Sequence, residues 1–120
     1  MGIGLRSARF QEIEPQASQG VGGPTNSSKT IATRSATHVE VWVDVIDVGV
    51  AGVLDVFYDI SPDGAKFIEE LSATGIVAAG LVKVGVLTRN DKDSVGLAGR
   101  ARFTVTTNAV EFKIFALVRE

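Results

Sequence analysis

Residues 53–64, VLDVFYDISPDG, are the stretch that decides the fold. Side chains alternate in character along residues 53–60, with the period of two that is typical of a β-strand. One face carries Leu54, Val56, Tyr58 and Ile60, and the other carries Val53, Asp55, Phe57 and Asp59. A tight turn follows at once, because Pro62 presets φ for the second turn position, Asp63 can hydrogen-bond its own backbone and Gly64 accepts positive φ. The stretch therefore predicts a strand that ends in a chain reversal.

The same alternation recurs on both sides of this stretch. Further strands are expected at residues 29–34, His38–Asp47, 66–71, 81–88, 98–107 and 110–118. Residues 49–52, GVAG, are expected to turn His38–Asp47 back onto residues 53–60 as a hairpin. Residues 66–71 fit either a strand with Phe67 inward or one helical turn, and we favour the strand. Seven or eight short strands, with no helix long enough for a crossover, predict an all-β fold that is an antiparallel sandwich or a barrel. We favour an antiparallel β-sandwich of the jelly-roll kind.

Apolar positions share one face of each expected strand, and we predict that these faces form the core. They are Val39, Val41, Val43 and Val45 in His38–Asp47, Ala101, Phe103 and Val105 in 98–107, and Phe112, Ile114 and Ala116 in 110–118. In residues 81–88 the expected inward residues are Val82, Val84 and Val86. Gly85 lies among them and indicates a bulge or a close backbone approach.

Residues 1–28 differ from the rest of the chain, because they are rich in Gly, Ser and Gln and lack a sustained apolar period. We interpret them as an extended N-terminal arm, followed by a β-sandwich domain over residues 29–120. The arm contains three large apolar residues, Leu5, Phe10 and Ile13. Isolated apolar residues in a polar segment are typical of segments that fold on binding a partner. These three are the predicted partner-binding residues. An unstructured terminus without a binding role is the alternative.

Composition excludes several classes of function. A net charge of −2 over 120 residues argues against a nucleic-acid partner, which requires Lys and Arg concentrated on one face. The absence of cysteine removes disulfides, thiol catalysis and thiolate metal sites together. The N-terminus lacks an apolar core of secretory length, and no apolar run approaches the ~20 residues of a membrane span. We expect no membrane association.

The sequence predicts no catalytic, cofactor or metal site. His38 is the sole histidine, and nothing near it in the sequence supplies the nucleophile and the orienting group that base catalysis needs. Asp44, Asp47, Asp55 and Asp59 alternate with apolar residues. A carboxylate pair or a calcium site is one interpretation, and we favour the other, that they coat the solvated face of the sheet. The chain is therefore predicted not to be an enzyme.

Two aromatic residues on strands leave an alternative open. Trp42 and Tyr58 can stack a sugar if they lie on an exposed sheet face, and they can equally belong to the core of a sandwich. We favour the core. A carbohydrate-binding module would require Trp42, Tyr58 or Phe57 to be exposed among polar neighbours.

Residues 38–118 resemble a group of small virion proteins of tailed bacteriophages. The shared pieces are a valine-rich strand at 41–47, the LDVxxxxSPDG-type segment at 54–64, an aromatic residue at Phe67, and a last hairpin that begins with RARFTVT at residues 100–106. These proteins commonly have Trp after the SPDG turn, and Phe67 departs from that pattern.

The resemblance implies a β-sandwich head decoration or cement protein. Such a protein binds the exterior of the capsid, stabilises the shell, needs no cofactor and is often a homotrimer. Its implied partners are the major capsid protein and neighbouring copies of itself, and its implied location is the virion surface after assembly in the host cytoplasm. A head-tail connector or tail protein and a carbohydrate-binding module are the alternative functions.

Overall fold

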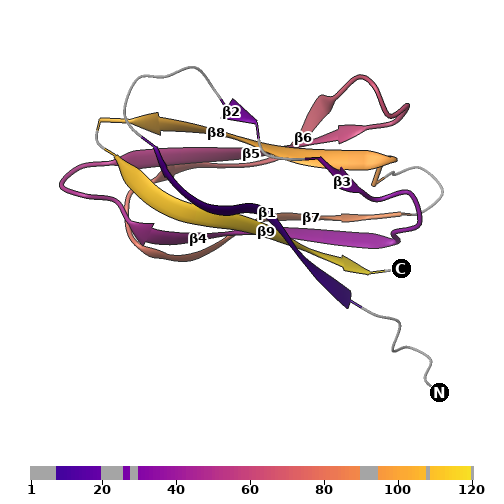
Figure 1. The fold of residues 1–120 in the computed structure, drawn as a ribbon, viewed down its shortest axis with the longest axis horizontal. Helices are drawn as coiled ribbons and strands as arrows, with labels where there is room; N and C mark the ends of the chain where they lie inside the picture. Colours follow the sequence, from indigo (N-terminus) through magenta and orange to yellow (C-terminus); the bar gives the residue numbers. More distant parts are fainter. Residues whose placement is uncertain (1–7, 20–25, 28–29, 90–94, 108, 120) are drawn as a thin grey trace.

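The computed structural model describes residues 8–19, 26–27, 30–89, 95–107 and 109–119, and for 8–19 and 26–27 it describes the backbone. Every regular element in these ranges is a β-strand. Seven are long and two, β2 and β3, have two residues each. The strands are β1 (Ala8–Gln19), β2 (Asn26–Ser27), β3 (Ile31–Ala32), β4 (His38–Asp47), β5 (Val53–Ser61), β6 (Ile68–Ile76), β7 (Gly80–Thr88), β8 (Ala98–Thr106) and β9 (Val110–Arg119) (Figure 1). No helix in the described ranges is long and apolar enough to cross a membrane.

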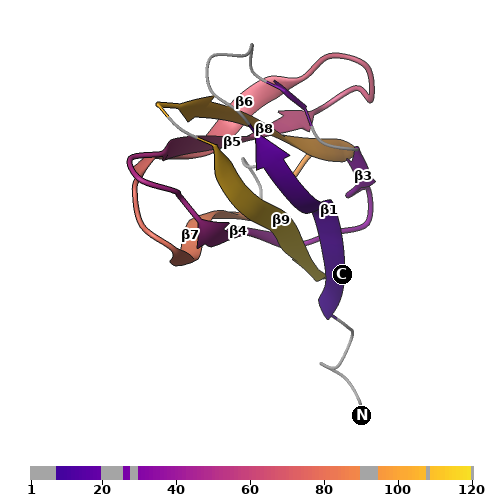
Figure 2. The same cartoon turned by 60° about the vertical axis from the view of Figure 1, so that its left-hand side comes forward.

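The strands form two antiparallel sheets that pack face to face (Figure 2). Sheet A has the order β1-β9-β4-β7, and sheet B has the order β2-β8-β5-β6, with β3 also pairing with β8. Of the long strands described, only β5 and β6 are paired with their neighbour in sequence, and every other connection from β3 onward passes between the sheets. This is the strand order of a jelly roll. The fold class expected from the sequence is confirmed.

The core lies between the sheets and is built from the alternating apolar faces. The four inward valines of β4 are at most 2% exposed, and β9 buries its matching residues beside them in sheet A. Strands β5 and β8 bury their inward residues from the opposite sheet. Phe103 of β8 and Phe112 of β9 meet edge to face, with ring centroids 5.1 Å apart, and so connect the two sheets. The inward faces predicted for β4, β5, β8 and β9 are confirmed.

The hairpin expected between β4 and β5 is wrong, because β4 belongs to sheet A and β5 to sheet B. Both strands carry an apolar face that needs cover, and placing them in opposed sheets lets each face bury the other across the ~10 Å between packed sheets. The linking loop is closed locally: Asp47 Oδ1 accepts a hydrogen bond from Gly49 N at 2.8 Å, and Val48 O accepts one from Gly52 N at 2.9 Å. Local alternation predicted both strands but not their sheets.

Strand β7 contains the bulge that its glycine predicted. Pairing with β4 shifts register between Val41 and Trp42, which oppose Gly85 and Lys83, so one extra residue of β7 is accommodated there. Val82 and Val84 face the core before the bulge, and Leu87 faces it afterwards. The prediction that Val86 lies inward is therefore wrong, because the bulge changes the phase of the alternation.

The SPDG turn forms as the sequence predicts. Asp63 Oδ1 accepts hydrogen bonds from the backbone N–H groups of Ala65 and Lys66, at 2.8 and 2.9 Å, and these bonds lower the pKa of its carboxyl group. Gly64 has φ +85°, the left-handed region. Phe67 follows as a half-buried residue just before β6 begins. The preference for a strand over a helical turn is confirmed from Ile68 onward, but the inward position expected for Phe67 is wrong, because Phe67 precedes the strand and its ring lies against Arg100 of the outer face.

Candidate functional site

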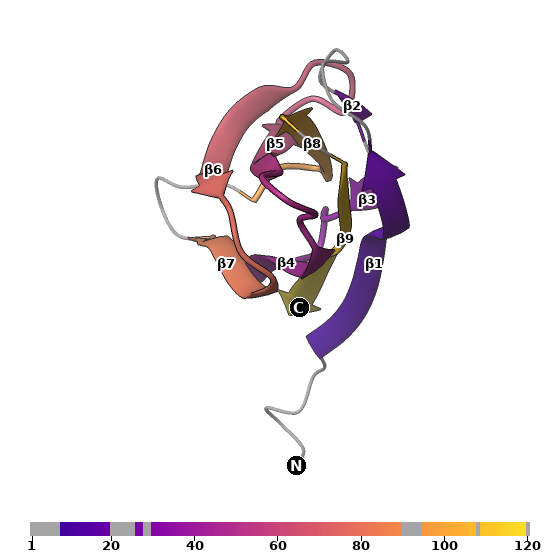
Figure 3. The same cartoon turned by 90° about the vertical axis from the view of Figure 1, so that its left-hand side faces the viewer.

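Strand β1 places the predicted arm residues in the chain's own sheet. It pairs antiparallel with β9 from Ala8↔Arg119 to Gln19↔Val110, with register irregularities on either side of Glu14. Figure 3 shows β1 along the margin of the sandwich, opposite the margin where β6 and β7 lie side by side. Phe10 and Ile13 lie within β1, and Leu5 lies outside the described residues.

The binding role of Leu5, Phe10 and Ile13 stays a prediction. The pairing of β1 with β9 differs from the expectation of an arm that is extended until a partner binds it. Residues 8–19 are already paired with β9 of the same chain. The arm lacked a sustained apolar period, so hydrophobic patterning gave no sign of this strand. Backbone pairing along an open sheet edge needs no such period.

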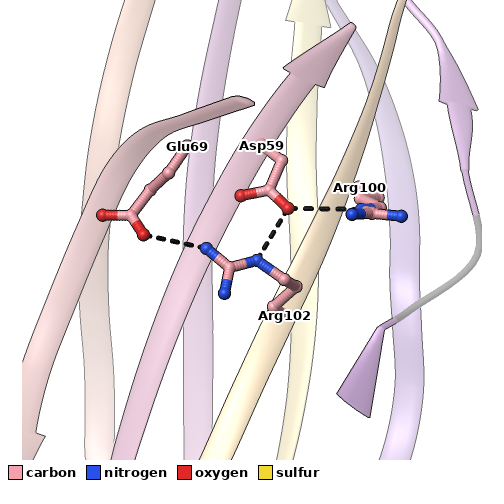
Figure 4. A network of polar contacts seen from close by, with 4 residues as sticks. All are labelled: Asp59, Glu69, Arg100 and Arg102. Carbon is pink, nitrogen blue, oxygen red and sulfur yellow. Dashed lines mark hydrogen bonds and ion pairs between the residues drawn. The ribbon is translucent and has the colours of Figure 1, made fainter. Parts of the chain in front are cut away.

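The outer face of sheet B carries a network of four charged side chains, which we call the charge network (Figure 4). Asp59 Oδ2 accepts hydrogen bonds from Arg100 Nε at 3.2 Å and from Arg102 Nε at 2.7 Å. Arg102 Nη2 also donates to Glu69 Oε1 at 2.8 Å. The network thus joins the three adjacent strands β5, β8 and β6.

Asp59 corrects the sequence-based view of the aspartates. It is 2% exposed, so it does not coat a solvated face, and its two arginine partners explain how the carboxylate is tolerated there. Asp44 and Asp47 lie on β4 in sheet A, whereas Asp55 and Asp59 lie on β5 in sheet B, so the four do not meet as neighbours. Asp55 Oδ1 accepts a hydrogen bond from Gly75 N at 2.8 Å.

Two phenylalanines support the charge network from the sides. The guanidinium carbon of Arg100 lies 4.2 Å from the ring centroid of Phe67, and that of Arg102 lies 4.9 Å from the centroid of Phe57. The hydrogen bond to Asp59 is the largest cause of a raised pKa at Arg102, which therefore stays charged. The two arginines pair with the two carboxylates, and each arginine also lies against a phenylalanine ring. This cluster is therefore suited to holding strands β5, β6 and β8 together.

The outer face of sheet A carries a second cluster, centred on Trp42, which we call the Trp42 cluster. Trp42 Nε1 donates a hydrogen bond to Glu40 Oε1 at 2.7 Å. Lys83 Nζ lies 3.6 Å from Glu40 Oε2 and 5.6 Å from the centroid of the indole ring. His38 Nε2 lies 3.8 Å from the same carboxylate. The indole hydrogen bond is the largest cause of the lowered pKa of Glu40.

The sequence analysis favoured core positions for Trp42 and Tyr58. This is correct for Tyr58 and wrong for Trp42. Tyr58 is fully buried, whereas Trp42 is half-buried and faces outward, because it alternates with the inward residues Val41 and Val43. Trp42 therefore lies on a sheet face among polar neighbours. That arrangement can stack a flat ligand face. Among the described residues, no group of three or more His, Cys, Asp or Glu side chains is placed to hold a metal ion.

One end of the sandwich carries exposed apolar side chains that the sequence analysis missed. Val50, Val77, Leu81 and Ile46 are exposed, Val50 by 93% and Val77 by 61%. They gather at one end because Val45 pairs with Gly80, which brings the β4–β5 loop beside the β6–β7 turn, at the left in Figure 1. A valine in the middle of a GVAG loop was the one available sequence signal. We call these four residues the apolar end.

Comparison with known proteins identifies the class of fold. No protein-family model and no curated protein matches the chain. Solved structures do match: the infectious bursal disease virus VP2 subviral particle at TM-score 0.65 and 10% identity, over 95% of this chain and 33% of that one. Infectious bursal virus derived T=1 particles match at TM-score 0.67 and 10% identity, over 95% and 32%. This chain therefore spans about a third of the length of those chains.

A chitosan-binding module of a chitosanase/glucanase from Paenibacillus sp. IK-5 is also similar in fold, at TM-score 0.47 and 10% identity, over 96% of this chain and 95% of that one. That score is too low to support an argument about function. The matches to the viral chains show that this chain has a β-sandwich like that of viral capsid protein domains. At such low identity the similarity concerns the fold alone.

Proposed function

We propose that this chain is a structural protein of a virus particle, a jelly-roll module that binds the exterior of a capsid and stabilises the shell. The observation that carries the proposal is the similarity of fold to viral particle proteins along nearly the whole chain. The resemblance of residues 38–118 to virion proteins of tailed phages supports it independently. The proposed partners are the major capsid protein and neighbouring copies of this chain, with a trimer as the expected assembly.

The physical properties of the sandwich suit that role. A decoration protein has to persist on the particle surface, and the charge network ties three strands of sheet B together across their outer face. Its contacts need not be strong individually, since many copies around a shell act together. The apolar end offers an exposed patch of the kind that marks protein interfaces. Nothing in this role requires catalysis, and we propose that the chain is not an enzyme.

Co-sedimentation with phage heads that lack this protein tests the proposal. We expect saturable binding at a fixed ratio to the major capsid protein, with the bound copies visible on the outer surface by cryo-electron microscopy. Density at the head-tail junction or along the tail would replace the decoration role with a connector or tail role. Failure to bind any part of the particle would overturn the proposal.

Single substitutions identify the contact surface in the same assay. Val50→Asp and Val77→Asp test the apolar end, with the exposed position Ala51 changed to Asp as the matched control. Leu5→Ser, Phe10→Ser and Ile13→Ser test the arm, with Gln11→Ser as the control. We expect at least one set to weaken binding while its control does not. Equal binding by all variants would exclude both surfaces.

A carbohydrate-binding role is the second candidate, and the half-exposed indole of Trp42 beside Glu40 and Lys83 favours it. A glycan array probed with the intact chain tests this role directly. Binding that is lost in Trp42→Ala and kept in Phe57→Ala would support it. An array without any signal would remove it.

A further inference from the structure

Within the described part of the chain, strand β1 pairs with one other strand. It lies at the margin of sheet A and hydrogen-bonds to β9 on its inner side. The pairing extends over the full length of both strands, although it is interrupted on either side of Glu14. Strand β1 is thus a peripheral element held largely by backbone hydrogen bonds to a single neighbour.

Without β1, strand β9 would be an edge strand with no feature that discourages pairing with another chain. Its inward residues Val110, Phe112, Ile114, Ala116 and Val118 are all fully buried. Removing β1 would leave ten residues of regular strand with a free row of N–H and C=O groups above this core. By contrast, the edge strand β6 carries the charged pair Glu69 and Glu70 directly after its first residue, and the edge strand β7 is bent by its bulge. Both devices discourage pairing with another chain.

The segment between β1 and β2 has the composition of a hinge. Residues 20–25 read GVGGPT, with three glycines and one proline. Six residues can span about 20 Å when extended, which equals the smallest dimension of the molecule, 20 Å. A strand connected by such a segment can reach the surface of an adjacent copy.

We propose that β1 exchanges between copies, so that the β1 of one chain pairs with the β9 of another. Both arrangements contain the same strand pairs in the same register, so their free energies differ through the hinge and the chain concentration. A short linker gives its tethered strand an effective concentration of about millimolar. Closed monomers therefore predominate at micromolar concentration, and exchange becomes competitive where copies are crowded. The inference rests on strand topology and not on the proposed virion role.

Engineered cysteines test the exchange in the full chain, which has none of its own. Ser18 and Glu111 are register partners across β1 and β9. The variants Ser18→Cys and Glu111→Cys are mixed and oxidised, and a disulfide between two chains is scored on a non-reducing gel. Asp44→Cys and Lys113→Cys form the matched control, because these register partners join the central strands β4 and β9, which cannot exchange without unfolding.

We expect mixed dimers from the first pair at several times the control yield, rising about tenfold between roughly 0.1 and 1 mM chain. The double variant Ser18→Cys/Glu111→Cys should form an intrachain disulfide at micromolar concentration. A mixed-dimer yield equal to the control would overturn the proposal. So would failure of the double variant to close, because β1 would then not lie on β9.

Discussion

The outer faces of the two sheets use charge in different ways. On sheet B a carboxylate is buried beneath two arginines, and each arginine lies against a phenylalanine ring. On sheet A the carboxylate of Glu40 is partly exposed, and it orients an indole that is open to solvent on one side. The first arrangement is costly to disturb, whereas the second leaves groups available to a partner. The comparison separates structural polar residues from residues free to bind.

Removing the carboxylate at the centre of the charge network should have the largest effect. Asp59→Ala leaves two half-buried arginines without their shared acceptor, and breaking a buried pair in this way costs about 3–5 kcal/mol. Denaturant unfolding measures the loss. Asp44→Ala, at an outward half-buried position of β4, is the matched control and should change the free energy of unfolding by about 0.5 kcal/mol or less. Equal effects would show that the network does not stabilise sheet B.

Two glycines extend the comparison to backbone packing. A methyl group at Gly99 would overlap the Tyr58 side chain at its hydroxyl and Cζ, and Tyr58 is locked in the core. We expect Gly99→Ala to cost about 1–3 kcal/mol. At Gly85 the added carbon would lie 2.7 Å from Leu71 Cδ2, the end of a flexible side chain that can move aside. Gly85→Ala should therefore cost less, and the reverse order, measured by thermal unfolding, would contradict this account.

Removing the Tyr58 hydroxyl should change the free energy of unfolding less, and the ionisation of this hydroxyl should make stability depend on pH. Its oxygen is buried and has no hydrogen-bond partner among the described residues, so Tyr58→Phe should be neutral or stabilising by up to about 1 kcal/mol. Burial raises the pKa of the phenol, so the unfolded chain ionises first and stability falls as the pH rises above about 10. As the chain has one tyrosine, tyrosinate absorbance should appear only with unfolding. Its appearance in the folded chain near pH 10 would refute this.

Protonation of Glu40 should give the smallest effect. Because folding lowers the pKa of this carboxyl below 4.5, its contribution to stability is present above that pH and is lost as the pH falls through the folded value. The fluorescence of Trp42, the sole tryptophan, should change over the same acid range as its hydrogen bond is lost. Glu40→Gln should abolish this transition. An unchanged transition in the variant would assign it to another group.

Alternation along the chain predicted which residues of β4, β5, β8 and β9 are buried, because a pleated strand presents every second side chain to one face. It did not predict that β4 and β5 lie in opposite sheets, since a four-residue GVAG loop fits a hairpin and a crossing between sheets equally well. The bulge in β7 was predicted from Gly85, yet its effect on the phase of Val86 was not.

The outer faces were harder to predict. Strand periodicity placed Asp59 opposite the core face of its strand, which is where it lies, but it could not supply the neighbours of Asp59. The preference for a core position was wrong for Trp42. Asp59 is buried because β8 brings Arg100 and Arg102 beside it from about 40 residues away. Trp42 stays half-exposed because its own strand already fills the core with valines. The apolar end depends on two loops that meet only in the folded chain.

The position of β9 also determines when sheet A can form. β9 comes last in chain order among these strands, yet it lies inside the sheet, between β1 and β4. During synthesis, β1 and β4 therefore leave the ribosome long before the strand that joins them exists. Strand β1 cannot form its pairing with β9 until residues 110–119 have been synthesised. Sheet A can therefore be completed only after residues 110–119 have been synthesised, and its reliance on distant pairing predicts slow folding, on the order of milliseconds to seconds.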